Sequence, residues 1–260
     1  MLIDTHCHLD AAEFNADRDA VALSALQAGV EKIVIPAVER ANFDAVIAAC
    51  QRHPHCAFAL GVHPMYVDHA TEDDLATLKT YVAKHQPVAI GEIGLDYFVK
   101  NAKEHPAHIE KQLYFFTEQL KIANQFHLPV ILHVRNAIDD VLKYLRKAKV
   151  NGGIAHAFNG SFQQAEQLIA LGFKLGFGGA MTYSRALHIQ ALAKQLPLEA
   201  IVLETDSPDI PPEWLGRQDR NTPAQTVKVA QFLADLRQVN VSQVLDITSA
   251  NALQILPKLA

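Results

Sequence analysis

Histidine is the residue type that stands out in this chain, because its 260 residues include 13 histidines. His6 and His8 follow the short apolar run at 2–3, and an i, i+2 pair on an extended segment points both imidazoles to the same side. Two imidazoles that converge in this way can bind one divalent ion. The start of the chain therefore predicts part of a metal site.

Other histidines and carboxylates follow similar apolar runs. His133 and His156 end the runs 129–133 and 153–156, Glu92 ends the run 88–92, His63 lies just past the run 56–61, and Asp206 lies two residues beyond the run 200–204. Buried imidazoles and carboxylates that converge repel one another or stay unsatisfied unless a cation joins them. Any one of them alone is more often a hydrogen-bonded core residue or a cap, but their joint occurrence favours a metal site.

The pairing of these residues predicts two ions. We expect His6, His8 and Asp206 to hold one, His133 and His156 to hold the other, and Glu92 to bridge them with its two oxygens. This arrangement is typical of hydrolases with two metals roughly 3.5–4 Å apart. The ligand types suit Zn²⁺, Mn²⁺, Ni²⁺ or Mg²⁺. The other histidines are expected at the surface: His53, His55, His69, His85, His105, His108, His127 and His188.

The elements that must position these residues alternate along the chain. Eight apolar runs have the continuous character of buried parallel strands: 2–3, 32–36, 56–61, 88–92, 129–133, 153–156, 173–177 and 200–204. Segments with helical spacing lie between and after them: 20–28, 75–83, 109–126, 138–147, 162–171, 189–196, 223–236 and 241–256. This order favours a single α/β domain that spans 1–260. We expect a (β/α)8 TIM barrel with its site at the C-terminal strand ends, and a doubly wound open sheet is the alternative.

Composition limits the classes of partner. The chain has 28 acidic and 23 basic residues, a formal charge of −5, so a polyanion would have to be bound by local groups rather than by a basic surface. Its three cysteines form no C-x-x-C pair, which indicates a reducing compartment. With no signal-peptide pattern and no long apolar stretch, we expect a soluble cytoplasmic protein without a membrane partner, and a monomer.

Six segments in order carry a family resemblance: IDTHCH at 3–8, GVHP at 61–64, GEIGLDY at 91–97, LPVILHVR at 128–135, HAFNGS at 156–161 and ETDSP at 204–208. They resemble the TatD family of metal-dependent deoxyribonucleases, and most of all its YjjV-like branch. The resemblance implies an amidohydrolase-like barrel that hydrolyses phosphodiester bonds in DNA with two divalent ions, held as assigned above, and it implies that His63 faces the substrate phosphate. Asn159 stands where many members have Ser or Thr, and Glu92 stands in place of a carbamylated lysine.

The expected mechanism assigns a role to each group. Asp206 accepts the proton of the attacking water, and Glu92 holds the metals. His63 and Arg135 steady the phosphate, with a rim salt bridge as the alternative for Arg135. Tyr97 and Phe98 stack on an unpaired base, or else pack within their own loop. The expected substrate is single-stranded DNA or a chain end, and the expected action is that of an exonuclease. Four basic residues would bind the DNA locally, near the site: Lys100, Lys103, Arg217 and Arg220.

Two other functions use the same residues. The site could hydrolyse an amide, ester or lactone, or remove a misattached amino acid from transfer RNA, because an activated water attacks carbonyl carbon as readily as phosphorus. A metal-stabilised scaffold without activity would lack a catalytic base, whereas this chain keeps Asp206 and every expected ligand.

Overall fold

The computed structural model describes residues 1–98, 105–216 and 219–260. Its eight strands form one parallel sheet in the order of the sequence. The strands are β1 (Leu2–Asp4), β2 (Val30–Pro36), β3 (Cys56–Leu60), β4 (Ala89–Asp96), β5 (Val130–Arg135), β6 (Gly153–Ala155), β7 (Phe173–Phe177) and β8 (Ile201–Leu203). Sequential order and parallel direction are the topology of a TIM barrel, as the sequence predicts.

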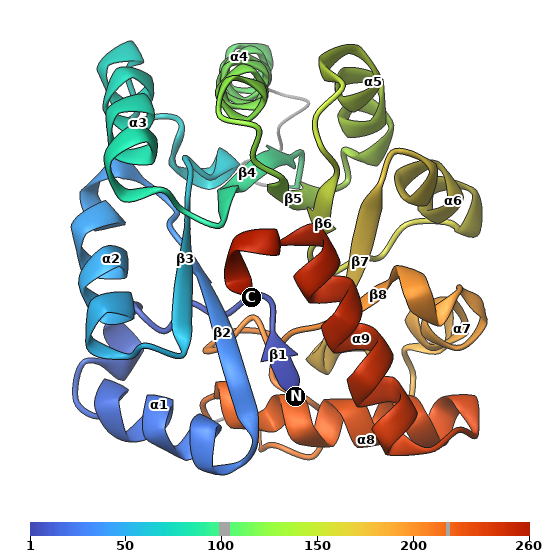
Figure 1. Cartoon of the computed structure of the whole chain (residues 1–260). Coiled ribbons are helices and arrows are strands. Elements are labelled where there is room, and N and C mark those ends of the chain that lie inside the picture. The colour runs from blue at the N-terminus through green and yellow to red at the C-terminus, as the bar shows by residue number, and fades with distance from the viewer. Residues whose placement is uncertain (99–104, 217–218) are drawn as a thin grey trace.

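Helices follow the strands and surround them. They are α1 (Arg18–Gln27), α2 (Phe43–Arg52), α3 (Glu72–His85), α4 (Pro106–Gln125), α5 (Ile138–Ala148), α6 (Phe162–Ala170), α7 (Leu187–Gln195), α8 (Thr226–Arg237) and α9 (Val241–Ile255). Figure 1 shows α1 to α8 as an outer ring, with α9 lying across one end of the strands. α2 is not among the helices predicted from the sequence, although Phe43, Val46, Ile47 and Cys50 form its buried face.

Backbone hydrogen bonds bring the two edges of the sheet together. The amide of Thr5 donates to the carbonyl of Leu203 at 3.0 Å, and the amide of His8 donates to the carbonyl of Ser207 at 2.8 Å. A parallel bridge joins Cys7 to Ser207. The segments that follow β1 and β8 are therefore neighbours at the C-terminal end of the barrel, so they can contribute side chains to the same site.

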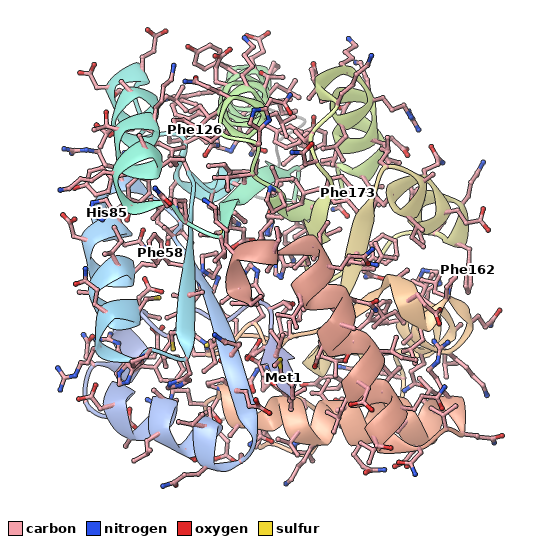
Figure 2. The ribbon with its side chains drawn as sticks, in the orientation of Figure 1. Met1, Phe58, His85, Phe126, Phe162 and Phe173 are labelled. Carbon is pink, nitrogen blue, oxygen red and sulfur yellow. The ribbon has the colours of Figure 1, made fainter. Side chains whose placement is uncertain are left out.

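The opposite end of the barrel is filled by apolar side chains. The barrel interior contributes Ile3, Val34, Ala59, Ile131, Ile154 and Val202, which pack with Ala252, Ile255, Leu256 and Leu259 of α9 and the residues after it. A second cluster joins the outer faces of the strands to the helices and includes Phe173 at the start of β7 (Figure 2). With the N-terminal end closed by α9, the C-terminal end is left for the site.

β4 differs from the expectation that Glu92 ends the fourth strand. The strand continues to Asp96, and its pairing with β5 shifts register between Ile90 and Ile93, so that Glu92 lies in an irregular part of the strand. Beyond it, Gly94 has a φ of +147°, and a Cβ there would lie 1.9 Å from the carbonyl oxygen of His133. Only glycine allows β4 to approach β5 this closely and continue.

Within residues 1–98, 105–216 and 219–260, every helix is too short or too polar to span a lipid bilayer.

Candidate metal centre

The structure brings the predicted ligands together at the C-terminal end of the barrel. His133 lies in β5 two residues after Ile131, which faces the barrel interior, and His156 lies two residues after Ile154, the matching interior residue of β6. Residues two apart on a strand point to the same side, so each imidazole stands above an apolar residue of the barrel. The sequence period of two therefore directs these side chains into the mouth.

One oxygen of Glu92 faces the histidines that follow β1. Glu92 Oε2 lies 3.2 Å from His6 Nε2 and 3.5 Å from His8 Nε2. Asp206 Oδ1 lies 3.5 Å from His6 Nε2 and 3.6 Å from His8 Nε2. Two imidazoles and two carboxylates thus converge at one side of the site, and they are the four residues that the sequence grouped there.

The other oxygen of Glu92 faces a second group. Glu92 Oε1 lies 3.1 Å from His133 Nδ1 and 3.1 Å from His156 Nε2, the second predicted pair. His63 Nε2 lies 3.3 Å from the same oxygen. His63 is buried and lies beside this second group, and its predicted contact with the substrate phosphate stays a prediction.

The donor set fits divalent ions. Among the described residues, three groups offer ligand atoms within 4.8 Å of one another: His6 with His156 and Asp206, His6 with His8 and Glu92, and His63 with Glu92 and His133. The Nε2 atoms of His6 and His8 are 3.2 Å apart, and the rings of His6 and His156 stack with centroids 3.9 Å apart. Crowded imidazole nitrogens and carboxylate oxygens are the ligands that such ions use.

Proton affinities in the cluster reflect the same crowding. Burial disfavours the charged form of Glu92, yet His63, His6 and His156 hold its pKa well below the ordinary value. Burial disfavours protonated His8, but hydrogen bonding and charge from Glu92 raise its pKa to about 9. Glu92 likewise raises the pKa of His133 and of His156 against the effect of burial, whereas burial lowers the pKa of His6 and of His63 and favours their neutral form. A metal cation bound here would displace the protons of the charged imidazoles.

Carboxylates outside the predicted set support the ligands. Asp96 Oδ2 lies 2.9 Å from His133 Nε2. Glu204 is buried, accepts a hydrogen bond from the amide of Ala157 at 2.6 Å, and lies 3.6 Å from His156 Nδ1 through the same oxygen. Neither residue is among the predicted site residues, although both stand in segments that carry the family resemblance.

Gly176 makes room for Glu204. A Cβ at Gly176 would lie 2.1 Å from Glu204 Oε2, so any larger residue on β7 would displace this carboxylate. Glycine at position 176 is therefore required for the carboxylate of Glu204 to keep its position.

The aromatic residues that follow β4 face different surroundings. The hydroxyl of Tyr97 donates to Asp140 at 2.9 Å, and its half-buried ring packs on the core. Phe98 is 57% exposed, and the guanidinium of Arg135 lies 3.7 Å from the centre of its ring. Because Arg135 follows His133 by two residues on β5, its side chain points toward the mouth. Phe98 and Arg135 thus form a stacked pair beside the metal centre.

Arg220 and His108 differ from the sequence expectations. Arg220 binds Asp17 with Nη2 at 2.6 Å and Nη1 at 3.0 Å from the carboxylate oxygens, so its guanidinium is engaged within the protein. His108, expected at the surface, is buried on α4, with Nδ1 2.6 Å from Asp68 Oδ1 and Nε2 2.8 Å from the amide nitrogen of Gln112. The other three basic residues proposed at the mouth, Lys100, Lys103 and Arg217, lie outside the described residues.

Comparisons with known proteins agree over nearly the whole chain. The family described as "TatD related DNase" matches residues 3–257. An uncharacterized metal-dependent hydrolase of Escherichia coli, YjjV, is 39% identical over 91% of this chain and 90% of its own length. The human deoxyribonuclease TATDN3 is 32% identical over 99% of this chain and 95% of its own. The crystal structure of YjjV superposes with a TM-score of 0.92 and 36% identity, covering 98% of each chain.

Proposed function

Because the chain belongs to the TatD related DNase family, whose members among its relatives are named metal-dependent hydrolases, we propose that it hydrolyses phosphodiester bonds in DNA with two divalent ions. In this proposal His6, His8 and Asp206 hold one ion. His133 and His156 hold the other, and Glu92 joins the two. Zn²⁺, Mn²⁺, Ni²⁺ and Mg²⁺ all suit this mixture of imidazole and carboxylate ligands.

The observation that carries the proposal is the division of Glu92 between two groups of ligands. Its Oε2 faces His6 and His8 at 3.2 and 3.5 Å, while its Oε1 faces His133 and His156 at 3.1 Å each. A carboxylate that serves one ion needs ligands around only one of its oxygens. Ligands around both oxygens support two ions with Glu92 between them.

The ions and the side chains have separate tasks in this reaction. Bound ions supply the positive charge that offsets the phosphate oxygens and lower the pKa of water towards ~7. Asp206 takes up the proton that the attacking water releases, because its carboxylate reaches the site from β8 beside His6 and His8. His63 contacts the substrate phosphate from the side of Glu92 Oε1. Arg135 offers a planar pair of N–H donors to the same phosphate.

The substrate is DNA with unpaired bases, in strands or at chain ends. The net charge of −5 gives no general attraction for a duplex, so binding depends on the metal ions and on local groups. The exposed ring of Phe98 and the adjacent guanidinium of Arg135 present a flat surface beside the site, on which a base can stack. Tyr97 supports this loop through its bond to Asp140 and completes the proposed substrate-binding set with His63 and Arg135.

A matrix of metals and substrates tests the proposal. Protein depleted of metal is reconstituted with each of the four ions and assayed on single-stranded oligodeoxynucleotide, bis(p-nitrophenyl) phosphate and a small lactone. We expect hydrolysis of both phosphodiesters and little of the lactone. Asp206→Asn should lose hydrolysis and keep the fold. Lactone hydrolysis without phosphodiester hydrolysis, or near-normal turnover by Asp206→Asn with full metal, would contradict the proposal.

A further inference from the structure

A cavity of about 490 Å³ lies between the loops that follow β7 and β8, at the same end of the barrel as the metal centre. It is lined by Ala180, Tyr183, Arg185, Ala186, Ile210 and Pro211, and we call it the β7–β8 pocket. Its size falls within the range of small-molecule sites. One wall belongs to the same loop as Asp206, four residues before Ile210. The pocket therefore shares a loop with one of the proposed metal ligands.

The walls of the pocket are tied together by hydrogen bonds. The hydroxyl of Tyr183 donates to the carbonyl of Pro211 at 3.0 Å, which joins the two loops. The amide and the hydroxyl of Ser184 both donate to Glu213, each at 2.9 Å. The amide of Glu213 donates in turn to Thr182 Oγ1 at 2.8 Å. The cavity is therefore formed by a fixed frame before any ligand enters.

The chemistry of the pocket is apolar with one cation. Alanine, isoleucine and proline side chains and the half-buried Tyr183 supply the walls, and the exposed Arg185 supplies a guanidinium. Within the part of the chain that the structure describes, no carboxylate forms an ion pair with Arg185. An apolar cavity with a single unpaired cation suits a ligand that has a flat apolar part and a phosphate.

The charges around the mouth also favour this side for a polyanion. Burial raises the pKa of Tyr66, which follows β3, and four carboxylates raise it further: Glu39, Asp10, Asp209 and Glu13. Three of them, Asp10, Glu13 and Glu39, follow β1 and β2, so this part of the rim repels phosphates, and Asp209 is the one that shares the loop of the pocket. Arg135 and Arg185 stand on β5 and after β7, across the barrel from β1 to β3.

We infer that the β7–β8 pocket holds the nucleotide next to the hydrolysed bond, with its base and sugar against Tyr183, Ala186 and Ile210. Arg185 binds the phosphate beyond that nucleotide. This inference rests on the proposed action on DNA and adds a subsite to it. When the phosphate to be hydrolysed lies at the metal centre, the rest of the DNA strand extends from it along the mouth of the barrel. The pocket can contact the first nucleotide of that extension. The occupant is thus one unit of a single strand, contacted without reading the sequence.

Steady-state hydrolysis by the metal-loaded enzyme tests the subsite. Arg185→Ala should raise KM for oligothymidylate by about tenfold, because one charge-assisted contact to phosphate is lost. The slope of log(kcat/KM) against log[salt] should become shallower by about 0.7, the value for one phosphate contact on a single strand. Bis(p-nitrophenyl) phosphate is too short to reach the pocket, so its KM should not change.

Matched variants separate the pocket from general effects. Arg146→Ala removes a guanidinium from the last turn of α5, at the other end of the barrel, and should leave the KM values for both substrates and the salt slope unchanged. Ala186→Phe fills the pocket and should raise KM for oligothymidylate more than for an abasic oligomer of the same length, which has only its sugars to place there.

The outcomes distinguish this inference from the proposed function. Suppose that the wild type hydrolyses oligothymidylate and that Arg185→Ala and Ala186→Phe have the same KM and the same salt slope. This result overturns the proposed nucleotide subsite and leaves the nuclease proposal standing. A metal-loaded wild type that hydrolyses neither phosphodiester overturns the nuclease proposal and the subsite with it.

Discussion

The buried carboxylate of Asp4 binds Thr205 twice, through Oδ1 to the amide at 3.0 Å and through Oδ2 to the hydroxyl at 2.6 Å. Asp4 ends β1 and Thr205 follows β8, so these bonds join the two segments that carry His6, His8 and Asp206. Asp4 Oδ1 also accepts from the amide of His6 at 3.2 Å. Asp4 thus fixes the spacing of three of the proposed ligands.

Replacing the carboxyl group of Asp4, whose pKa burial raises to about 7, should therefore cost stability. Asp4→Asn keeps the shape but replaces one acceptor oxygen with a donor group, and it should lower the free energy of unfolding by about 1–3 kcal/mol. Urea denaturation measures the change. In a double-mutant cycle with Thr205→Val the two losses should not add, because each variant breaks the same bond. Additive losses would show that the two residues do not depend on each other.

Glu204 should control the affinity of the metal site through His156. In Glu204→Gln the amide oxygen can still face both the amide of Ala157 and His156 Nδ1, because one oxygen of Glu204 faces both, but the negative charge beside the imidazole is lost. We expect metal affinity about tenfold weaker or more, because a charged carboxylate next to the second ring nitrogen makes the imidazole a stronger ligand. Competition with a chelator measures this, with circular dichroism as the check on the fold. Unchanged metal affinity in a folded Glu204→Gln variant would argue against this role.

The stacked pair of Phe98 and Arg135 should affect substrate binding more than turnover. Phe98→Leu removes the ring 3.7 Å below the guanidinium, a contact worth about 0.5–1 kcal/mol at an exposed site. KM for oligodeoxynucleotide should rise about threefold to fivefold, with kcat nearly unchanged. In an Arg135→Ala background the same substitution should have a smaller effect. If Phe98→Leu has its full effect without Arg135, the ring acts on the substrate independently.

The positions of the proposed ligands can be predicted from the sequence, because each ligand stands in or soon after an apolar run that forms a strand. All strands of a TIM barrel run in the same direction. His133 and His156 are the plainest cases, since the period of two places them above Ile131 and Ile154. Parallel strands end at one face, so residues distant in the sequence meet there. Local pattern and topology are sufficient for this part of the site.

Other features depend on contacts that no local pattern records. The course of β4 beyond Glu92 requires a register shift against β5 and the close approach at Gly94, so an apolar run alone ends the strand too early. His108 is buried because Asp68, 40 residues away, accepts its ring hydrogen bond. The role of Glu204 depends on Gly176, which lies on another strand. In each case the deciding partner belongs to a different element.

The metal content of Glu92→Ala tests the central claim most directly. Purified wild type, Glu92→Ala and the surface control Glu166→Ala are loaded with the same metal, passed through a desalting column and analysed by inductively coupled plasma mass spectrometry. Because Glu92 lies between both groups of ligands, we expect two ions per chain in the wild type and in Glu166→Ala, and less than one in a folded Glu92→Ala. Two ions per chain in Glu92→Ala would contradict the shared carboxylate on which the proposed function depends.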